Sequence, residues 1–141
     1  MSAEPSLKYV LREMGPQARE FYRWLERGEL STTFCDSCDR FLFPPRRWCT
    51  QCGEELGWRA LSGRGTVYAF TQQERGLRFT APEVVGIVEL EEGVRVFGVF
   101  EDRFEKLAIG KAIEVRLRRD VPGITLLGFR LVDVETARAQ R

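Results

Sequence analysis

The sequence predicts a mainly β protein that consists of an N-terminal helix, a small ribbon closed by four cysteines, and a five-stranded barrel. Three observations predict it. An amphipathic stretch ends just before Gly28, two Cys-x-x-Cys pairs lie within residues 30–61, and five runs of β-forming residues follow Gly63. The 141 residues are enough for one domain or two very small ones.

Residues 16–27 are predicted to form the helix. Pro16 suits its first turn, and Gly28 suits the position just past its end. The apolar residues share one broad stripe: Ala18, Phe21, Tyr22, Trp24 and Leu25. The charged residues are expected to face outward: Glu20, Arg23, Glu26 and Arg27. The stripe either covers part of the core, which we favour, or docks on a partner through Phe21 and Trp24.

Two cysteine pairs predict a metal site. Cys35 and Cys38 are separated by two residues, ten residues follow, and Cys49 and Cys52 repeat the spacing. A two-residue gap lets both sulfurs of a turn approach one ion at about 2.3 Å, and two such turns complete a tetrahedron. Gly53 allows the backbone to turn after the second pair. Four thiolates leave no open position, so we expect a structural zinc ion rather than a catalytic one. The alternatives are two disulfides and a rubredoxin-like iron site.

Five runs of β-forming residues follow the cysteines, at 65–73, 84–90, 94–100, 113–117 and 125–134. Residues 91–93, Glu-Glu-Gly, indicate a tight hairpin between the second and third runs, and residues 107–110 are expected to form a short, helical connector after the third. Five strands with an insert at that point is the strand count of an OB-fold barrel. In the fourth run, Ile113, Val115 and Leu117 are expected to face inward. The intervening charged residues, with the next arginine, are expected to be a solvated strand face: Glu114, Arg116, Arg118 and Arg119.

These patterns predict four segments along the chain. Residues 1–29 form an N-terminal helical segment, 30–61 the zinc ribbon, 62–134 the OB-fold domain and 135–141 a flexible C-terminal tail. No apolar run reaches the ~18 residues that a membrane span requires, and the N-terminus lacks the apolar stretch of a signal peptide. We therefore expect a cytoplasmic protein without a membrane partner.

Composition argues against self-contained catalysis. The chain has no histidine, which removes the commonest general base near neutral pH. If all four cysteines hold zinc, no thiol nucleophile remains. The formal net charge is +1, so no broad basic field favours a polyanionic partner. A binding or accessory role fits these residues better than an enzyme.

The order of motifs resembles a known family. The helix is followed by Gly28-x-Leu30, the first cysteine pair, Phe-Pro-Pro-Arg at 43–46 and the second pair; Trp58, residues 62–71, residues 88–93 and Ile109-Gly110 come next. This order is similar to the small proteins with a rubredoxin-like zinc ribbon and an OB-fold, the domain of unknown function 35 family. The resemblance runs from about residue 18 to residue 132.

The resemblance implies a role in acyl-CoA, lipid or steroid metabolism. Members of that family are similar to accessory subunits of thiolase-like enzymes: thiolases, hydroxymethylglutaryl-CoA synthases and thiolase-like aldolases of steroid side-chain breakdown. The small subunit is thought to bind the acyl-CoA or complete its tunnel, while the partner carries the catalytic residues. We therefore expect a non-catalytic, zinc-stabilised subunit of a hetero-oligomer.

An acyl-CoA would need cations for its phosphates and an apolar slot for its pantetheine arm. The candidate cations are Arg46, Arg47 and Arg64, and the candidate slot walls are Phe43, Pro45, Trp48 and Tyr68. The alternatives are that Arg64 is merely solvated and that Phe43 and Trp48 pack the ribbon on the barrel.

Three other roles remain open from the sequence. Zinc ribbons and OB barrels also occur in nucleic-acid-binding proteins, in which exposed aromatic side chains stack on bases. A lone thioesterase or hydrolase would need paired carboxylates such as Glu91 and Glu92, but adjacent residues on a turn point apart. A homodimer would cover ribbon aromatics against a second copy.

Overall fold

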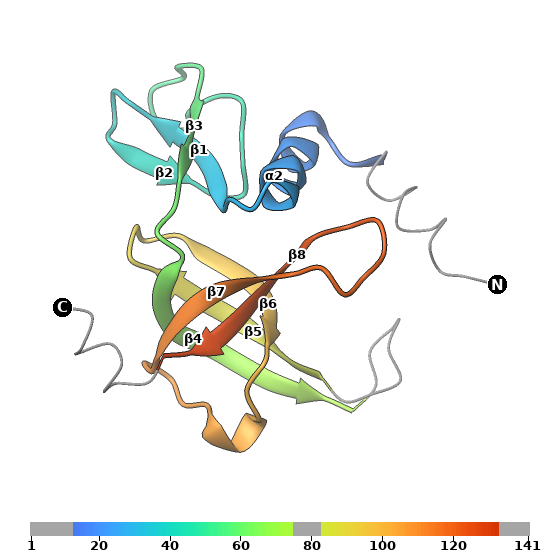
Figure 1. The fold of residues 1–141 in the computed structure, drawn as a ribbon. Coiled ribbons are helices and arrows are strands. Elements are labelled where there is room, and N and C mark those ends of the chain that lie inside the picture. Colours follow the sequence, from blue (N-terminus) through green and yellow to red (C-terminus); the bar gives the residue numbers. More distant parts are fainter. Residues whose placement is uncertain (1–12, 75–82, 133–141) are drawn as a thin grey trace. The chain divides into compact units, whose positions relative to one another are not determined.

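The computed structural model describes residues 13–74 and 83–132, and they divide into two compact units. One unit contains residues 13–62 together with 117–126, and the other contains 63–116 together with 127–132 (Figure 1). Within the described ranges, no helix combines the length and the apolar character that a membrane crossing requires.

Helix α2 spans Pro16–Glu26, as the sequence predicts to within one residue. Gly15 precedes it in an extended conformation, and Pro16 occupies the first turn, where a missing N–H costs nothing. Gly28 ends the helix with a φ of 94°, and its N–H donates to the Leu25 carbonyl at 3.0 Å. This is the left-handed ending that glycine adopts without strain. The predicted apolar stripe buries Phe21 and Leu25.

The ribbon is a three-stranded antiparallel sheet in the order β2-β1-β3. Its strands are β1 (Ser31–Cys35), β2 (Arg40–Leu42) and β3 (Gly57–Ala60). Every residue of the central strand β1 is buried. The hydroxyls of Thr32 and Thr33 both donate to the Leu42 carbonyl, at 2.8 and 2.9 Å. The two buried threonine hydroxyls are thereby satisfied, which burial requires.

The second unit is built on a closed five-stranded barrel in the order β4-β5-β6-β8-β7. Its strands are β4 (Arg64–Gln73), β5 (Glu83–Leu90), β6 (Arg95–Phe100), β7 (Ala112–Arg118) and β8 (Leu126–Leu131). Strand β6 pairs with β8 in parallel, and β4 closes the barrel on β7. The side chains that are at most 1% exposed form the core: Val67, Val88, Val96, Ile113 and Phe129.

Glycine is required where β6 approaches β8. A Cβ at Gly98 would lie 2.8 Å from the Leu127 carbonyl oxygen and 2.8 Å from the Phe129 ring. Real Cβ atoms essentially never come that close, so the two strands meet at this distance only because position 98 has no side chain.

Two local predictions differ from the structure. The connector after β6 contains a short helical turn, but the turn is η1 (Phe104–Lys106), and residues 107–110 are not helical. Leu107 is buried in an extended conformation and Gly110 has a φ of 89°, so the helical turn cannot continue through them. The alternation in β7 is also weaker than predicted: Ile113 is buried, but Val115 and Leu117 are half-buried. The fifth run ends as a strand at Leu131; residues 133–134 and the predicted tail lie outside the described residues.

Candidate metal centre

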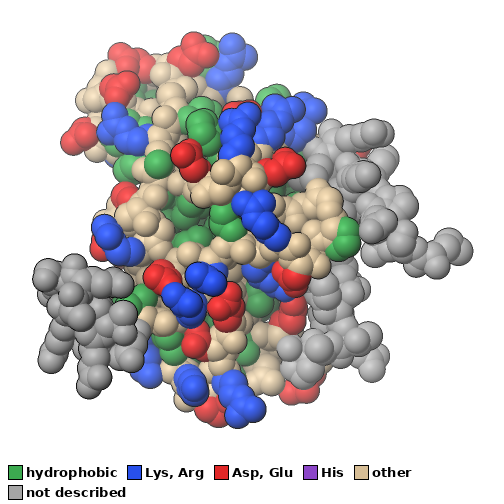
Figure 2. All heavy atoms as spheres, viewed as in Figure 1, with side chains coloured by type: hydrophobic (Ala, Val, Ile, Leu, Met, Phe, Trp, Pro, Cys, Tyr) green, Lys and Arg blue, Asp and Glu red, His purple; other side chains and the backbone are tan. Residues whose placement is uncertain are grey.

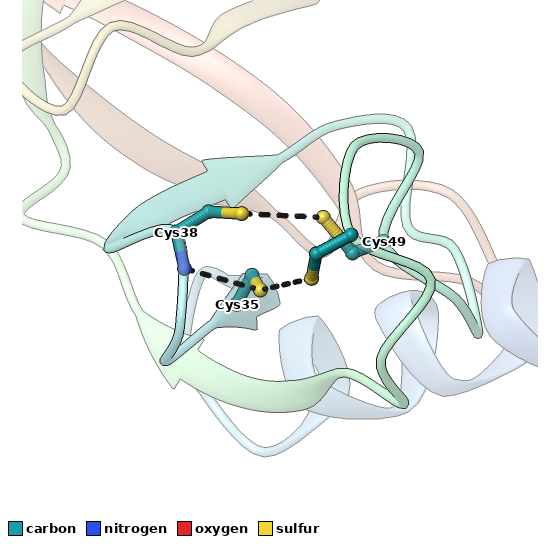
Figure 3. A group of neighbouring side chains, drawn as sticks. Cys35, Cys38 and Cys49 are labelled. Atoms are coloured by element: carbon teal, nitrogen blue, oxygen red, sulfur yellow. Dashed lines mark hydrogen bonds between the residues drawn. The ribbon is translucent and has the colours of Figure 1, made fainter.

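The four cysteines come together at one end of the ribbon. Cys35 is the last residue of β1, and Cys38 lies in the turn that leads to β2. Asp39 takes a φ of 52° in that turn, which brings the chain back sharply. Cys49 and Cys52 lie in the second turn, where the Gly53 N–H donates to the Cys49 carbonyl at 3.0 Å. Figure 3 shows the side chains of Cys35, Cys38 and Cys49 directed toward one another.

The sulfur positions fit a tetrahedral metal site. All four Sγ atoms lie within 4.8 Å of one another. The Sγ atoms of Cys35 and Cys52 are 3.5 Å apart, and those of Cys38 and Cys49 are 3.9 Å apart. Metal–sulfur bonds of about 2.3 Å at tetrahedral angles place sulfurs roughly 3.8 Å apart, so these two sulfur–sulfur distances bracket the expected edge. The sulfurs therefore surround one centre.

Backbone N–H groups prepare the sulfurs for a cation. The N–H of Cys38 donates to Cys35 Sγ, and the N–H of Gln51 donates to Cys49 Sγ, both at 3.4 Å. Backbone donors at Cys52 and Gln51 lower the pKa of the Cys49 thiol to about 6. A hydrogen bond with the Cys52 thiol raises the pKa of Cys38 to about 12, because the crowded sulfurs share protons. A divalent cation would replace those protons and hold all four sulfurs as thiolates.

These sulfurs fit a structural zinc ion, in agreement with the spacing of the cysteines. The disulfide alternative is wrong, because the 3.5 Å between Cys35 and Cys52 is far longer than a sulfur–sulfur bond of about 2.05 Å, and all four cysteines are free. Four protein thiolates complete a tetrahedral shell, so the ion would have no position for water or substrate. Its contribution is to the stability of the ribbon.

Comparison with known proteins agrees with both parts of the fold. Residues 25–57 match the rubredoxin-like zinc ribbon domain of ChsH2, and residues 58–118 match the C-terminal OB-fold domain of ChsH2. A DUF35 domain-containing scaffold protein of Methanocaldococcus jannaschii is 30% identical over 139 residues, which cover 92% of this chain and 98% of the relative. The chain belongs to the DUF35 family. A second DUF35 scaffold protein, from Methanothermobacter thermautotrophicus, is 31% identical over 74% of this chain and 86% of the relative.

Solved structures share the fold of this DUF35 protein. The Ltp2–ChsH2(DUF35) aldolase contains a chain that superposes with a TM-score of 0.77 at 24% identity, over 84% of this chain and 97% of the other. A DUF35 protein of unknown function from Sulfolobus solfataricus superposes with a TM-score of 0.61 at 14% identity, over 92% and 96% of the two chains. These two DUF35 chains therefore share the fold of this chain, a zinc ribbon followed by an OB barrel.

Five of the seven predicted ligand residues lie in the ribbon unit. Arg47 and Trp48 are neighbours in space as well as in sequence: the guanidinium lies 5.0 Å from the centre of the indole, which is 52% exposed. Arg47 also pairs with Glu55 at 3.8 Å. Phe43 instead packs on α2, with its ring 5.6 Å from that of Phe21. Beside them, Pro45 is half-buried and Arg46 is exposed.

The other two predicted ligand residues belong to the barrel unit. Arg64 begins β4, and its guanidinium donates to both carboxylate oxygens of Glu91 at 3.3 Å. Tyr68 is 44% exposed, and the Arg95 guanidinium lies 4.0 Å from the centre of its ring. Arg64, a candidate phosphate ligand, is thus already paired with Glu91 within the barrel.

The contact of Arg119 with the end of α2 was not predicted from the sequence. Arg119 was expected on a solvated strand face, but β7 ends one residue earlier, at Arg118. The Arg119 guanidinium donates to the Glu26 carbonyl at 3.2 Å and to Thr125 Oγ1 at 3.5 Å. Arg118, expected to face outward, is only 17% exposed and pairs with Asp120 at 2.9 Å. The strand pattern did not reveal this, because the Glu26 carbonyl that Arg119 bonds lies 93 residues away in the chain. The turn at residues 121–123 was the available signal that the chain leaves the sheet.

Proposed function

We propose that this DUF35 protein is a non-catalytic scaffold subunit that docks on a thiolase-like enzyme and helps to hold its acyl-CoA substrate. The observation that carries the proposal is the closed tetrathiolate site in a chain without histidine. All four cysteines of the chain contribute to that site, so neither a thiol nucleophile nor an open metal position is left for acyl transfer. The relative that matches 92% of this chain is named a DUF35 domain-containing scaffold protein, which supports the same role.

The partner is proposed from two sources. The family resemblance implies a thiolase-like enzyme, and the fold superposes on a chain of the Ltp2–ChsH2(DUF35) aldolase. Exposed aromatic side chains supply the anchors that such an interface needs. On the barrel, Phe97 is 62% exposed and lies directly opposite Ile87 across the β5–β6 pair, and on the ribbon Trp48 is exposed. We place the partner contact on Phe97 of the barrel.

The acyl-CoA part of the proposal rests on the ribbon loop. Arg46 is exposed and Arg47 stacks on the exposed Trp48, so the loop offers guanidinium groups beside an apolar ring. Guanidinium groups suit phosphate and an indole suits a pantetheine arm. Phe43 and Pro45 are the more buried members of the loop, and they would form its floor.

Co-expression with the thiolase-like enzyme of the same organism tests the proposal. The two chains should co-purify, and the enzyme's turnover of acyl-CoA should rise when this chain is present. Phe97→Ala should weaken the complex, whereas Thr66→Ala, an exposed change on the same barrel, should not. Melting curves of the variants check that each is folded. Failure to co-purify, with unchanged enzyme activity, would show that the proposal is wrong.

Nucleic-acid binding is the second candidate, and one observation favours it. Tyr68, stacked by Arg95, and Phe97 are exposed aromatics on an OB-type barrel, and such side chains stack on bases. However, Arg95 pairs with Glu89 at 3.0 Å, and Figure 2 shows acidic groups interspersed with basic ones on the viewed face. Single-stranded RNA that binds with an affinity falling steeply as salt rises would support this candidate over the scaffold role.

A further inference from the structure

The helix-containing unit has a cavity of about 520 Å³ that lies away from the cysteines. Four residues at helical spacing on α2 line one side: Arg19, Tyr22, Arg23 and Glu26. The other side is the segment that joins β7 to β8, from Arg119 through Val121–Thr125. All ten lining residues belong to the same compact unit. The volume is within the range of about 300–1,000 Å³ that is typical of small-molecule sites.

The charge of the cavity wall favours an anion. Three guanidinium groups line it against a single carboxylate, that of Glu26. Within residues 13–74 and 83–132, neither Arg19 nor Arg119 forms an ion pair, and both hydrogen-bond acceptors of Arg119 are uncharged oxygens. Arg23 pairs with Glu20 at 3.3 Å, but an arginine has five N–H donors, and that contact uses one. The cavity wall therefore carries more positive than negative charge, and its guanidinium groups keep N–H donors for a ligand.

Arg119 is held in place before any ligand arrives. Its guanidinium bridges from the end of α2, at the Glu26 carbonyl, to Thr125 Oγ1 on the opposite wall. Thr125 is itself buried, so this wall is firmly anchored. A guanidinium that is already positioned loses little conformational freedom on binding a phosphate, which favours affinity.

The rest of the wall is apolar and neutral. Val121 is buried and Ile124 half-buried, and Pro122 and Gly123 lie between them in the sequence. Tyr22 adds a phenol whose ring meets that of Phe21 edge-on at 5.4 Å. Burial raises the pKa of Tyr22, so its hydroxyl stays a neutral donor near neutral pH. A ligand that fits this cavity carries negative charge at one end and a flat or apolar group at the other.

We propose that this cavity binds an organic phosphate of the nucleotide type, with its phosphates at Arg19, Arg23 and Arg119 and its base against Val121, Pro122 and Ile124. A free nucleoside diphosphate and the nucleotide end of coenzyme A share this chemistry. The cavity is distinct from the ribbon loop proposed above for acyl-CoA, and the inference does not depend on the partner enzyme.

Calorimetric titration of the zinc-loaded full chain with ADP, coenzyme A, adenosine and pyrophosphate tests the inference. ADP or coenzyme A should bind at least about tenfold more tightly than adenosine, because a charged hydrogen bond to phosphate is lost with the phosphates. Arg19→Gln should weaken binding by about tenfold for the same reason, and it breaks no side-chain hydrogen bond or ion pair among the described residues. Tighter binding of coenzyme A than of ADP identifies coenzyme A as the source, and equal or weaker binding identifies the free nucleotide.

The control and the contrary outcomes are equally specific. Arg40→Gln removes an exposed arginine of the same unit that does not line the cavity, and it should leave affinity unchanged. Arg119→Gln is a second test, accompanied by a melting curve because Arg119 joins two segments. The inference is overturned if neither ADP nor coenzyme A binds, if adenosine binds as well as they do, or if Arg19→Gln and Arg40→Gln weaken binding equally. Loss of the partner enzyme's response, with this binding intact, would overturn only the scaffold proposal.

Discussion

Replacing Cys35 by serine should unfold the ribbon, because this residue links the metal site to the most buried strand of its unit. Cys35 is 1% exposed and ends β1, and every residue of that strand is buried. Its sulfur lies 3.5 Å from that of Cys52, on one edge of the tetrahedron. A serine hydroxyl is a poor zinc ligand, so the variant would keep three thiolates and an open position.

The expected loss is comparable to the whole stability of a small unit. Structural zinc contributes on the order of 10 kcal/mol in small zinc-dependent folds at neutral pH. A buried hydroxyl without a partner costs about 1–3 kcal/mol more. Domains are stable by only about 5–15 kcal/mol in total, so the variant's ribbon should be unfolded at room temperature.

Metal analysis and urea denaturation measure the effect together. The wild-type chain should hold one zinc ion. The Cys35→Ser variant should hold much less zinc, and the early part of its cooperative unfolding transition in urea should be lost. Thr50→Ala is the matched control: it lies in the second cysteine turn, and its hydroxyl only accepts a 3.0 Å hydrogen bond from Arg40. Removing zinc from the wild type with a chelator should reproduce the Cys35→Ser result. A Cys35→Ser variant with full metal content and an unchanged urea midpoint would refute the reasoning.

Three further predictions concern packing and titration. Leu25→Ala should destabilise the protein by about 2–5 kcal/mol in urea, because Leu25 is fully buried, whereas Ile109→Ala at a 64% exposed site should change it by less than about 0.5 kcal/mol. Gly98→Ala should lower the unfolding free energy by about 1–3 kcal/mol, because its Cβ would collide with β8. Gly57→Ala is the control, because a Cβ there would meet no atom within 4 Å. Equal urea midpoints for the two variants would contradict the close approach of β6 and β8. Burial raises the pKa of Tyr22 above its ordinary value of 10.0, so its contribution to stability is complete below pH 10.0 and is lost as the pH rises through the higher folded pKa. The unfolding free energy of the wild type should therefore fall relative to that of Tyr22→Phe above pH 10, and parallel curves for the two proteins would show that the phenol is not desolvated.

The metal site and the hairpin of β5 and β6 could be predicted because both depend on local spacing. Two residues between cysteines suffice to aim two sulfurs at one ion, and the structure places all four sulfurs within 4.8 Å of one another. The run before residues 91–93 and the run after them are joined by a tight turn, so β5 and β6 follow directly from the sequence. Pro16 and Gly28 fixed the limits of α2 in the same local way.

The rest depends on contacts between distant residues. Arg119 follows a strand of alternating character, and nothing near it in the sequence reveals that its partner is the carbonyl of Glu26. Arg64 suits phosphate by type, but its pairing with Glu91 arises only when β4 and β5 come together. Leu107 could be assigned to a helical connector because its burial in the barrel unit is invisible to local periodicity. Candidate ligand residues chosen by type alone therefore remain predictions, whereas the cysteines were identified by spacing.

The segment from residue 117 to residue 126 belongs with the helix and ribbon, although both strands that it joins are barrel strands. The chain is therefore interleaved: it visits the first unit, the second, the first again and the second again. A single cut after Ser62 would separate α2 from Arg119 and leave neither half with its full set of residues. Neither unit corresponds to one continuous stretch of the gene, so a fragment that ends at Ser62 would lack the 117–126 segment whose Arg119 bonds to the end of α2.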